Sequence, residues 1–88
     1  MSWKIEIKPS AEKQYRKLDK KTRKRFKNAL LALEKENNPL LAANVRPLTG
    51  ELRGDYRLRT GKWRVLFTPN EDKKIIHIYA IIPRGDAY

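Results

Sequence analysis

Hydrophobic and charged residues alternate at the start of the chain, and a helical spacing follows. Residues 3–8 read Trp-Lys-Ile-Glu-Ile-Lys, the period of two that is typical of a half-buried strand, and Pro9 ends it. Ser10 is the expected N-cap of the next element. The apolar stripe of that element consists of Ala11, Tyr15 and Leu18. This pattern predicts a strand and then a short helix that ends at the polar residues 19–21.

A second and longer helical pattern follows this polar break. Its stripe consists of Thr22, Phe26, Ala29, Leu30 and Leu33. It ends near residues 37–39, Asn-Asn-Pro, and we expect the two helices to form a hairpin. A run of six basic residues lies around its start: Lys20, Lys21, Arg23, Lys24, Arg25 and Lys27. This run is either a solvated helix surface or a contact for nucleic acid.

The second half of the chain reads as a loop and three strands. Residues 39–50 show no sustained periodicity and predict a connecting loop that packs against the sheet. Strands are expected at about 52–59, 62–68 and 73–82, joined by Thr60-Gly61 and by residues 69–72. The order β-α-α-β-β-β predicts an α+β fold, with a two-helix hairpin on one face of a small antiparallel sheet. We expect residues 1–88 to form a single domain.

The charge of the chain indicates its class of partner. Lysine and arginine number 21 against 10 aspartate and glutamate, a net charge of +11 that favours a polyanion such as nucleic acid. No stretch approaches the roughly 20 apolar residues that span a bilayer, and the first residues do not resemble a signal peptide. We therefore expect a cytoplasmic protein. With no cysteine and only His77, we expect neither a disulfide, a metal site nor a cofactor.

The hairpin around Thr60-Gly61 separates apolar from cationic side chains. With those two residues as the turn, Arg59 lies opposite Lys62 and Arg57 lies opposite Arg64. The apolar side chains fall on the other face: Tyr56, Leu58, Trp63, Val65 and Phe67. Like charges directly opposite in a sheet cost about 0.2–1 kcal/mol per pair, so the cationic face predicts an anionic ligand. The alternative is an ordinary solvated face on which long basic side chains splay apart.

Two further side chains follow the last strand. Arg84 and Tyr88 lie on the tail, in which Gly85 permits a sharp turn. A guanidinium group grips phosphate, and a phenol ring can stack on an unstacked RNA base. We therefore expect Arg84 and Tyr88 to extend the cationic face into an RNA site. His77, in the middle of the apolar last strand, is expected to be structural.

Two segments carry a resemblance to a known family. Residues 58–67, Leu-Arg-Thr-Gly-Lys-Trp-Arg-Val-Leu-Phe, and residues 83–88, Pro-Arg-Gly-Asp-Ala-Tyr, resemble RelE/ParE-type toxins of toxin–antitoxin modules, and the tail is typical of short archaeal-like RelE members. The resemblance covers nearly the whole chain. It implies a metal-independent, ribosome-dependent endoribonuclease that cuts mRNA in the A site by attack of a ribose 2′-hydroxyl. It also implies an antitoxin, the ribosome and mRNA as partners.

The same resemblance implies roles for individual residues. Arg64 and Arg84 would stabilise the transition state at phosphorus or protonate the leaving oxygen, and Tyr88 would orient the scissile nucleotide. Asp55 and Arg57 stand where the best-studied pattern has two lysines. Arginine is a poor base because its pKa is above 12, so electrostatic stabilisation would carry more of the reaction. The expected RNA contacts outside the reacting centre are Arg53, Arg59 and Lys62.

Two other functions remain open at this point. ParE-like members of the family poison DNA gyrase without cutting nucleic acid. A non-catalytic RNA-binding module would have the same charge and a salt-dependent affinity, but it would leave its RNA intact. The cationic residues of the hairpin and the tail favour the ribonuclease, because a protein-binding toxin has no evident need for them.

Overall fold

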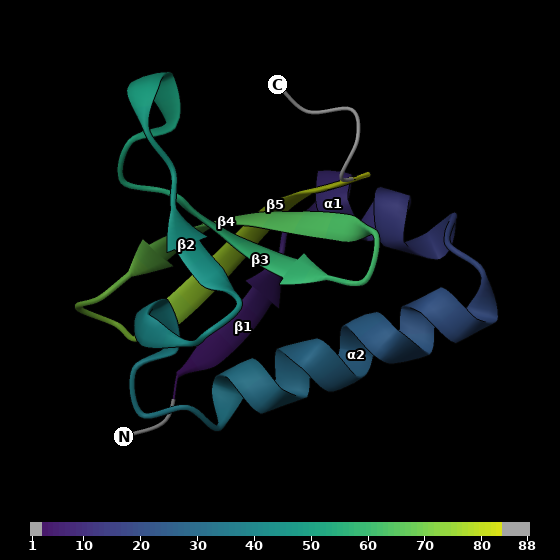
Figure 1. The fold of residues 1–88 in the computed structure, drawn as a ribbon, viewed down its shortest axis with the longest axis horizontal. Helices are drawn as coiled ribbons and strands as arrows, with labels where there is room; N and C mark the ends of the chain where they lie inside the picture. Colours follow the sequence, from purple (N-terminus) through teal and green to yellow (C-terminus); the bar gives the residue numbers. More distant parts are fainter. Residues whose placement is uncertain (1–2, 84–88) are drawn as a thin grey trace.

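The computed structural model describes residues 3–83, which form a five-stranded sheet with two helices (Figure 1). The strands lie in the order β1-β5-β4-β3-β2. The helices are α1 (Pro9–Arg16) and α2 (Lys20–Glu34). The strands are β1 (Lys4–Ile7), β2 (Val45–Pro47), β3 (Tyr56–Thr60), β4 (Trp63–Asn70) and β5 (Ile75–Pro83). Two short 3₁₀ turns cover Pro39–Leu41 and Gly50–Leu52.

The predicted α+β class and the predicted order of helices and long strands are confirmed, but the sheet differs in two respects. It is mixed rather than antiparallel, because β1 pairs with β5 in parallel after the chain has crossed through both helices. The segment predicted as a loop contains β2, which pairs with β3 through Val45 and Leu58. A strand of three residues is too short to show a period of two, and Pro47 is tolerated because β2 is an edge strand.

The first helix begins two residues earlier than an N-cap at Ser10 would place it. Pro9 occupies the first turn, where its missing N–H costs nothing, and the N-cap is Lys8 rather than Ser10. The Ser10 hydroxyl instead donates to the Tyr79 carbonyl oxygen at 3.1 Å, and Gln14 Oε1 accepts from the Ile81 amide at 2.8 Å. Side chains of α1 thus form hydrogen bonds with backbone groups of β5 in the part of β5 that extends past its pairing with β1.

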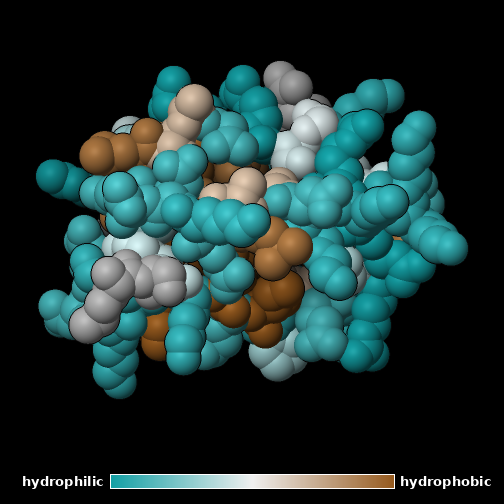
Figure 2. Space-filling view, turned by 90° about the horizontal axis from the view of Figure 1, so that it is seen from below, coloured by the Kyte–Doolittle hydropathy of each residue, from teal (hydrophilic) through white to brown (hydrophobic). Residues whose placement is uncertain are grey.

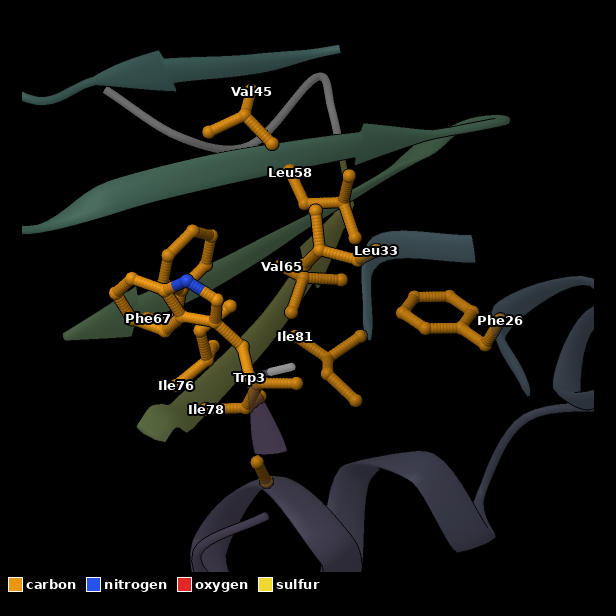
Figure 3. Close-up of a cluster of buried hydrophobic side chains, with 11 residues drawn as sticks. Trp3, Phe26, Leu33, Val45, Leu58, Val65, Phe67, Ile76, Ile78 and Ile81 are labelled. Atoms are coloured by element: carbon orange, nitrogen blue, oxygen red, sulfur yellow. The ribbon is translucent and has the colours of Figure 1, made fainter. Parts of the chain in front are cut away.

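The hydrophobic core lies between the sheet and the helices (Figure 3). Phe26 and Leu33 reach it from α2, and Ala11 reaches it from α1. The strand residues buried there are Val45, Leu58, Val65, Phe67, Ile76, Ile78 and Ile81, with Trp3 just before β1. Burial of each large side chain contributes about 1.5–3 kcal/mol. Tyr56 and Trp63 pack against this cluster, so the predicted apolar face of the hairpin is confirmed.

The outer surface is mostly hydrophilic on the side that carries α2, with hydrophobic atoms exposed near its middle (Figure 2). A groove between β1 and α2 is lined by Ile5, Ile7, Tyr15, Lys27, Leu30, Leu31 and Glu34. Leu31 is 46% exposed. Neither helix within residues 3–83 has the length and apolar character needed to cross a membrane.

Candidate nucleic-acid interface

The β3–β4 hairpin turns at Gly61 and Lys62 rather than at Thr60 and Gly61. Thr60 pairs with Trp63 across the strands, and Gly61 has a φ of 56°. A two-residue turn with glycine first and a negative φ at the second position has the twist that a hairpin favours. The predicted turn would have required Thr60, which is β-branched, at the position that glycine occupies. The predicted register is therefore wrong by two residues.

This register changes the cationic pairs and moves Lys62 from the predicted cationic face into the turn, but it leaves the strand residues on the two faces that were predicted. Arg59 lies opposite Arg64, while Arg57 lies between Leu66 of β4 and Arg46 of β2. The predicted pairs, Arg57 with Arg64 and Arg59 with Lys62, are wrong. The faces are confirmed because a shift of two residues returns each side chain to the same side of the sheet. We call the cations that share the side away from the core the arginine face: Arg46, Arg57, Arg59 and Arg64.

Arg46 belongs to the arginine face although the sequence does not indicate it, because the pattern of residues 39–50 predicts a loop where β2 lies. Its Nη1 donates to the carbonyl oxygens of Ala43 at 3.1 Å and Val45 at 2.9 Å. These bonds fix the guanidinium group near the edge of the sheet. Arg59 is exposed, while Arg57 and Arg64 are half-buried. The face therefore combines the hydrogen-bonded guanidinium group of Arg46 and two half-buried arginines with a more exposed side chain, Arg59.

Lys62 lies with a different group of cations. It lines a pocket of about 240 Å³ at the tip of the hairpin, together with Lys21, Arg25 and Trp63. The guanidinium group of Arg25 reaches the turn, where a Cβ on Gly61 would lie 3.0 Å from its Nη1. Part of the basic run of α2 thus meets the hairpin on the helix side, so Lys62 does not extend the arginine face.

The other predicted site residues are Arg53, Arg84 and Tyr88, and none of them lies in the β3–β4 hairpin. Arg53 is exposed in the segment before β3, where it lines a separate pocket with Pro47 and Tyr56. Arg84 and Tyr88 lie outside the described residues. Pro83, the last described residue, pairs with Trp63 at the end of the sheet that carries Arg64 and Ile82.

A carboxylate lies on the same side of the sheet as the arginines. Asp55 Oδ1 accepts a hydrogen bond from the Thr68 hydroxyl at 2.9 Å, and Oδ2 accepts one from the Tyr79 hydroxyl at 2.8 Å. Both carboxylate oxygens are thus oriented by hydroxyl groups of β4 and β5. The sequence places Asp55 at a family position but does not indicate these partners, because Tyr79 belongs to a run, residues 75–82, that is mostly apolar.

His77 completes this polar end of the sheet. It pairs with Thr68 of β4 and Glu6 of β1 in the register, and its Nδ1 lies 3.4 Å from Glu6 Oε1. Its side chain is 24% exposed. A pocket of about 470 Å³ is lined by Lys8, Asp55, Thr68, His77 and Tyr79, and we call it the Asp55 pocket. His77 therefore faces a pocket on the open side of the sheet, although its sequence context predicted a structural role.

The geometry of the arginine face suits an anionic chain. Side chains directly opposite on paired strands have Cβ atoms about 4.5–5.5 Å apart, which places the Arg59 and Arg64 guanidinium groups within reach of one phosphate. Charge-assisted and bidentate bonds from arginine to phosphate are among the strongest hydrogen bonds in proteins. Within residues 3–83, no three His, Asp or Glu side chains are grouped as a metal site requires.

Comparisons with known proteins identify one family that matches nearly the whole chain. The model of the ParE toxin of the type II toxin–antitoxin system parDE matches residues 5–88. An archaeal RelE–RelB complex from Pyrococcus horikoshii OT3 contains a chain that is 32% identical, with a TM-score of 0.79, and the match covers 99% of this chain and 100% of that chain. A search of curated proteins gives no significant match.

More distant structures share the fold. A RelBE toxin–antitoxin complex from Mycobacterium tuberculosis matches with a TM-score of 0.82 at 18% identity, covering 96% of this chain and 100% of that chain. The isolated E. coli RelE toxin matches with a TM-score of 0.71 at 20% identity, covering 93% and 84%. The family match over residues 5–88 and the archaeal relative show that the chain belongs to the RelE/ParE superfamily of type II toxin–antitoxin toxins.

Proposed function

We propose that this toxin is a ribosome-dependent endoribonuclease that cuts mRNA in the ribosomal A site. The observation that carries the proposal is the direct opposition of Arg59 and Arg64 on the open side of the sheet, with Arg57 beside them. The repulsion between two opposed arginines lowers the stability of the free protein. A phosphate bound between the guanidinium groups offsets this repulsion. A single toxin domain of residues 1–88, acting in the cytoplasm where ribosomes translate, is part of this proposal.

The proposed reaction is an internal transfer at phosphorus. The ribose 2′-oxygen forms a bond to the adjacent phosphorus and loses its proton, while the bond from phosphorus to the 5′-oxygen breaks and that oxygen gains a proton. Arg64 and Arg84 stabilise the charge on the phosphoryl oxygens, and Tyr88 orients the nucleotide. Because positive charge at the phosphate comes from guanidinium groups, the proposal requires no metal or cofactor.

The other arginines serve binding and position in this scheme. Arg57 holds the RNA strand beside the reacting phosphate. It is given no role as a base, because arginine has a pKa above 12. Arg59 contacts the RNA backbone on the arginine face, while Arg53 and Lys62, which lie off that face, contact the RNA where it extends beyond the face. Correct placement of the 2′-oxygen in line with the leaving oxygen then supplies much of the rate.

We further propose a cognate antitoxin as partner. Several similar structures are complexes of a RelE-type toxin with its antitoxin, including the archaeal relative. On this chain the antitoxin would cover the arginine face and the apolar groove between β1 and α2, whose volume is about 310 Å³. An antitoxin bound in this way would exclude mRNA from the site.

A ParE-like inhibitor of DNA gyrase is the second candidate. One observation favours it, because the family model that matches residues 5–88 is that of the ParE toxin. The arginine face favours the ribonuclease instead, since inhibition through protein contact gives no reason for opposed arginines.

Primer extension on a translated reporter mRNA tests the proposal. Induction of the toxin should stop growth and produce cuts at A-site positions, and R64A or R84A should reduce cutting by about 10²-fold or more. R64K keeps the charge but loses the bidentate fork, and it should rescue only part of the activity. K24A removes an exposed cation of α2 and should leave cutting unchanged. Intact mRNA during growth arrest, together with inhibited supercoiling by gyrase, would instead establish the second candidate.

A further inference from the structure

The Asp55 pocket lies beside the arginine face but has a different chemistry. Its volume of about 470 Å³ is within the range of about 300–1,000 Å³ that is common for small-molecule sites. It is lined by a carboxylate, two hydroxyl groups, an imidazole and one exposed amine. The carboxylate in this pocket would repel phosphate. Its presence in a chain of net charge +11 is therefore unexpected if the surface binds phosphate alone.

The position of the pocket relates it to the strand of RNA. Asp55 precedes Arg57 by two residues, which corresponds to about 7 Å along β3 on the same side of the sheet. On β4, Thr68 likewise lies two residues from Leu66, on the same side of the sheet. Leu66 is the residue that lies opposite Arg57. An RNA strand that lies on the arginine face with its phosphates held would therefore bring a neighbouring nucleotide over the pocket.

The hydrogen bonds of Asp55 define what the pocket can recognise. A carboxylate offers about four acceptor positions, and the bonds from Thr68 and Tyr79 use one on each oxygen. These bonds hold the carboxylate in a fixed orientation and leave acceptor capacity for a donor from outside. A carboxylate accepts well from the exocyclic amino group of cytosine, and it meets an unfavourable carbonyl oxygen on uracil.

We propose that the Asp55 pocket is a base-recognition subsite that selects a nucleobase with an exocyclic amino group, cytosine, adenine or guanine, over uracil in the RNA strand bound on the arginine face. This inference rests on the proposed function, since it requires RNA as the ligand. Lys8 at the rim contributes attraction for the phosphate of the same nucleotide. A cationic side chain of a partner protein would also fit a carboxylate, but the adjoining arginines repel it and attract RNA.

Binding of short single-stranded oligonucleotides tests the inference without the ribosome. The probes are labelled oligo-C, oligo-A and oligo-U of equal length with 2′-O-methyl riboses, which cannot be cut, and fluorescence anisotropy at fixed salt gives each Kd. The wild-type protein should bind oligo-C and oligo-A at least about fivefold more tightly than oligo-U. D55N should reduce this ratio to less than about twofold, because an amide also donates to the uracil carbonyl oxygen.

The ratio of Kd values separates base recognition from simple charge removal. E71Q also removes a carboxylate, from the exposed β4–β5 turn, and it should raise the affinity for all three probes while leaving the ratio unchanged. T68V removes one hydrogen bond to Asp55 at an exposed position, so it keeps the test valid if D55N does not fold, and it should also lower the ratio.

The outcomes distinguish this inference from the proposed function. Equal binding of the three probes, with affinity lost in R59A and R64A, would overturn base recognition and leave RNA as the ligand. A preference that D55N does not change would overturn the role of the pocket. Loss of antitoxin binding in D55N with an unchanged ratio would assign the pocket to the protein partner instead. Failure of every probe to bind, while cuts at A-site positions persist on translated mRNA, would overturn base recognition by the pocket and leave the proposed function intact.

Discussion

Arg59 and Arg64 lie directly opposite each other on β3 and β4, where cross-strand pairs usually combine opposite charges or apolar groups. The pair should destabilise the free protein and should stabilise its complex with a phosphate. R59Q should therefore increase the free energy of unfolding by about 0.2–1 kcal/mol at low salt, and the gain should shrink as salt screens the repulsion. Urea unfolding at two salt concentrations measures both quantities.

The control for R59Q removes one positive charge from a strand that has no cation opposite. Lys4 lies on β1 opposite Ile75 and is exposed, so K4Q lowers the net charge equally. The difference between the two variants reports the Arg59–Arg64 repulsion alone. Equal stabilities of R59Q and K4Q would mean that the two guanidinium groups do not interact.

The Tyr79 hydroxyl should contribute measurably to stability through Asp55. Y79F removes a 2.8 Å hydrogen bond to a half-buried carboxylate and should lower the free energy of unfolding by about 1–2 kcal/mol. Y56F is the matched control, because Tyr56 stacks on Phe67 with ring centroids 5.9 Å apart, and its hydroxyl has no hydrogen-bond partner within residues 3–83. A loss in Y56F as large as that in Y79F would contradict the role of Asp55.

The alternation of the hairpin strands was enough to predict the two faces of the sheet, although the pairing was wrong. The faces depend only on whether a residue number is odd or even within each strand, and a shift of two residues preserves this. The partner of each arginine depends on the conformation of the turn. That conformation required glycine at the first central position, which places Gly61 and Lys62 in the turn.

The Asp55 pocket was harder to predict, because its residues come from four separate segments. Lys8, Asp55, Thr68 and His77 meet only through the parallel pairing of β1 with β5 and the antiparallel pairings of β4 with β5 and with β3. Local periodicity carries no information on such long-range pairing. The proposed roles of Arg84 and Tyr88 stay predictions, since both lie outside the described residues.

The pKa of Asp19 gives a test at the start of α2. The Thr22 side-chain hydroxyl hydrogen-bonds to the exposed Asp19 carboxylate and lowers its pKa below the ordinary value. Because the folded-state pKa is lowered, this stabilisation is present above about pH 4 and is lost as the pH falls through the folded-state pKa. T22A should raise the pKa of Asp19 toward its ordinary value in an NMR titration. T49A, far from α2 in the chain, is the control and should leave the titration unchanged.

Leu31 tests the proposed antitoxin contact independently of RNA. Its side chain is 46% exposed at the groove between β1 and α2, so L31E should change the free energy of unfolding by less than about 0.5 kcal/mol. A carboxylate in an apolar contact should weaken the binding of the cognate antitoxin by about tenfold or more, since an unpaired charge would be buried. A32E adds the same charge at the next residue of α2, which is exposed and does not line the groove. Calorimetric titration of both variants with antitoxin, alongside anisotropy with RNA, should show a loss for L31E in the first measurement only. Equal losses in L31E and A32E would mean that added charge, rather than contact at the groove, controls antitoxin binding.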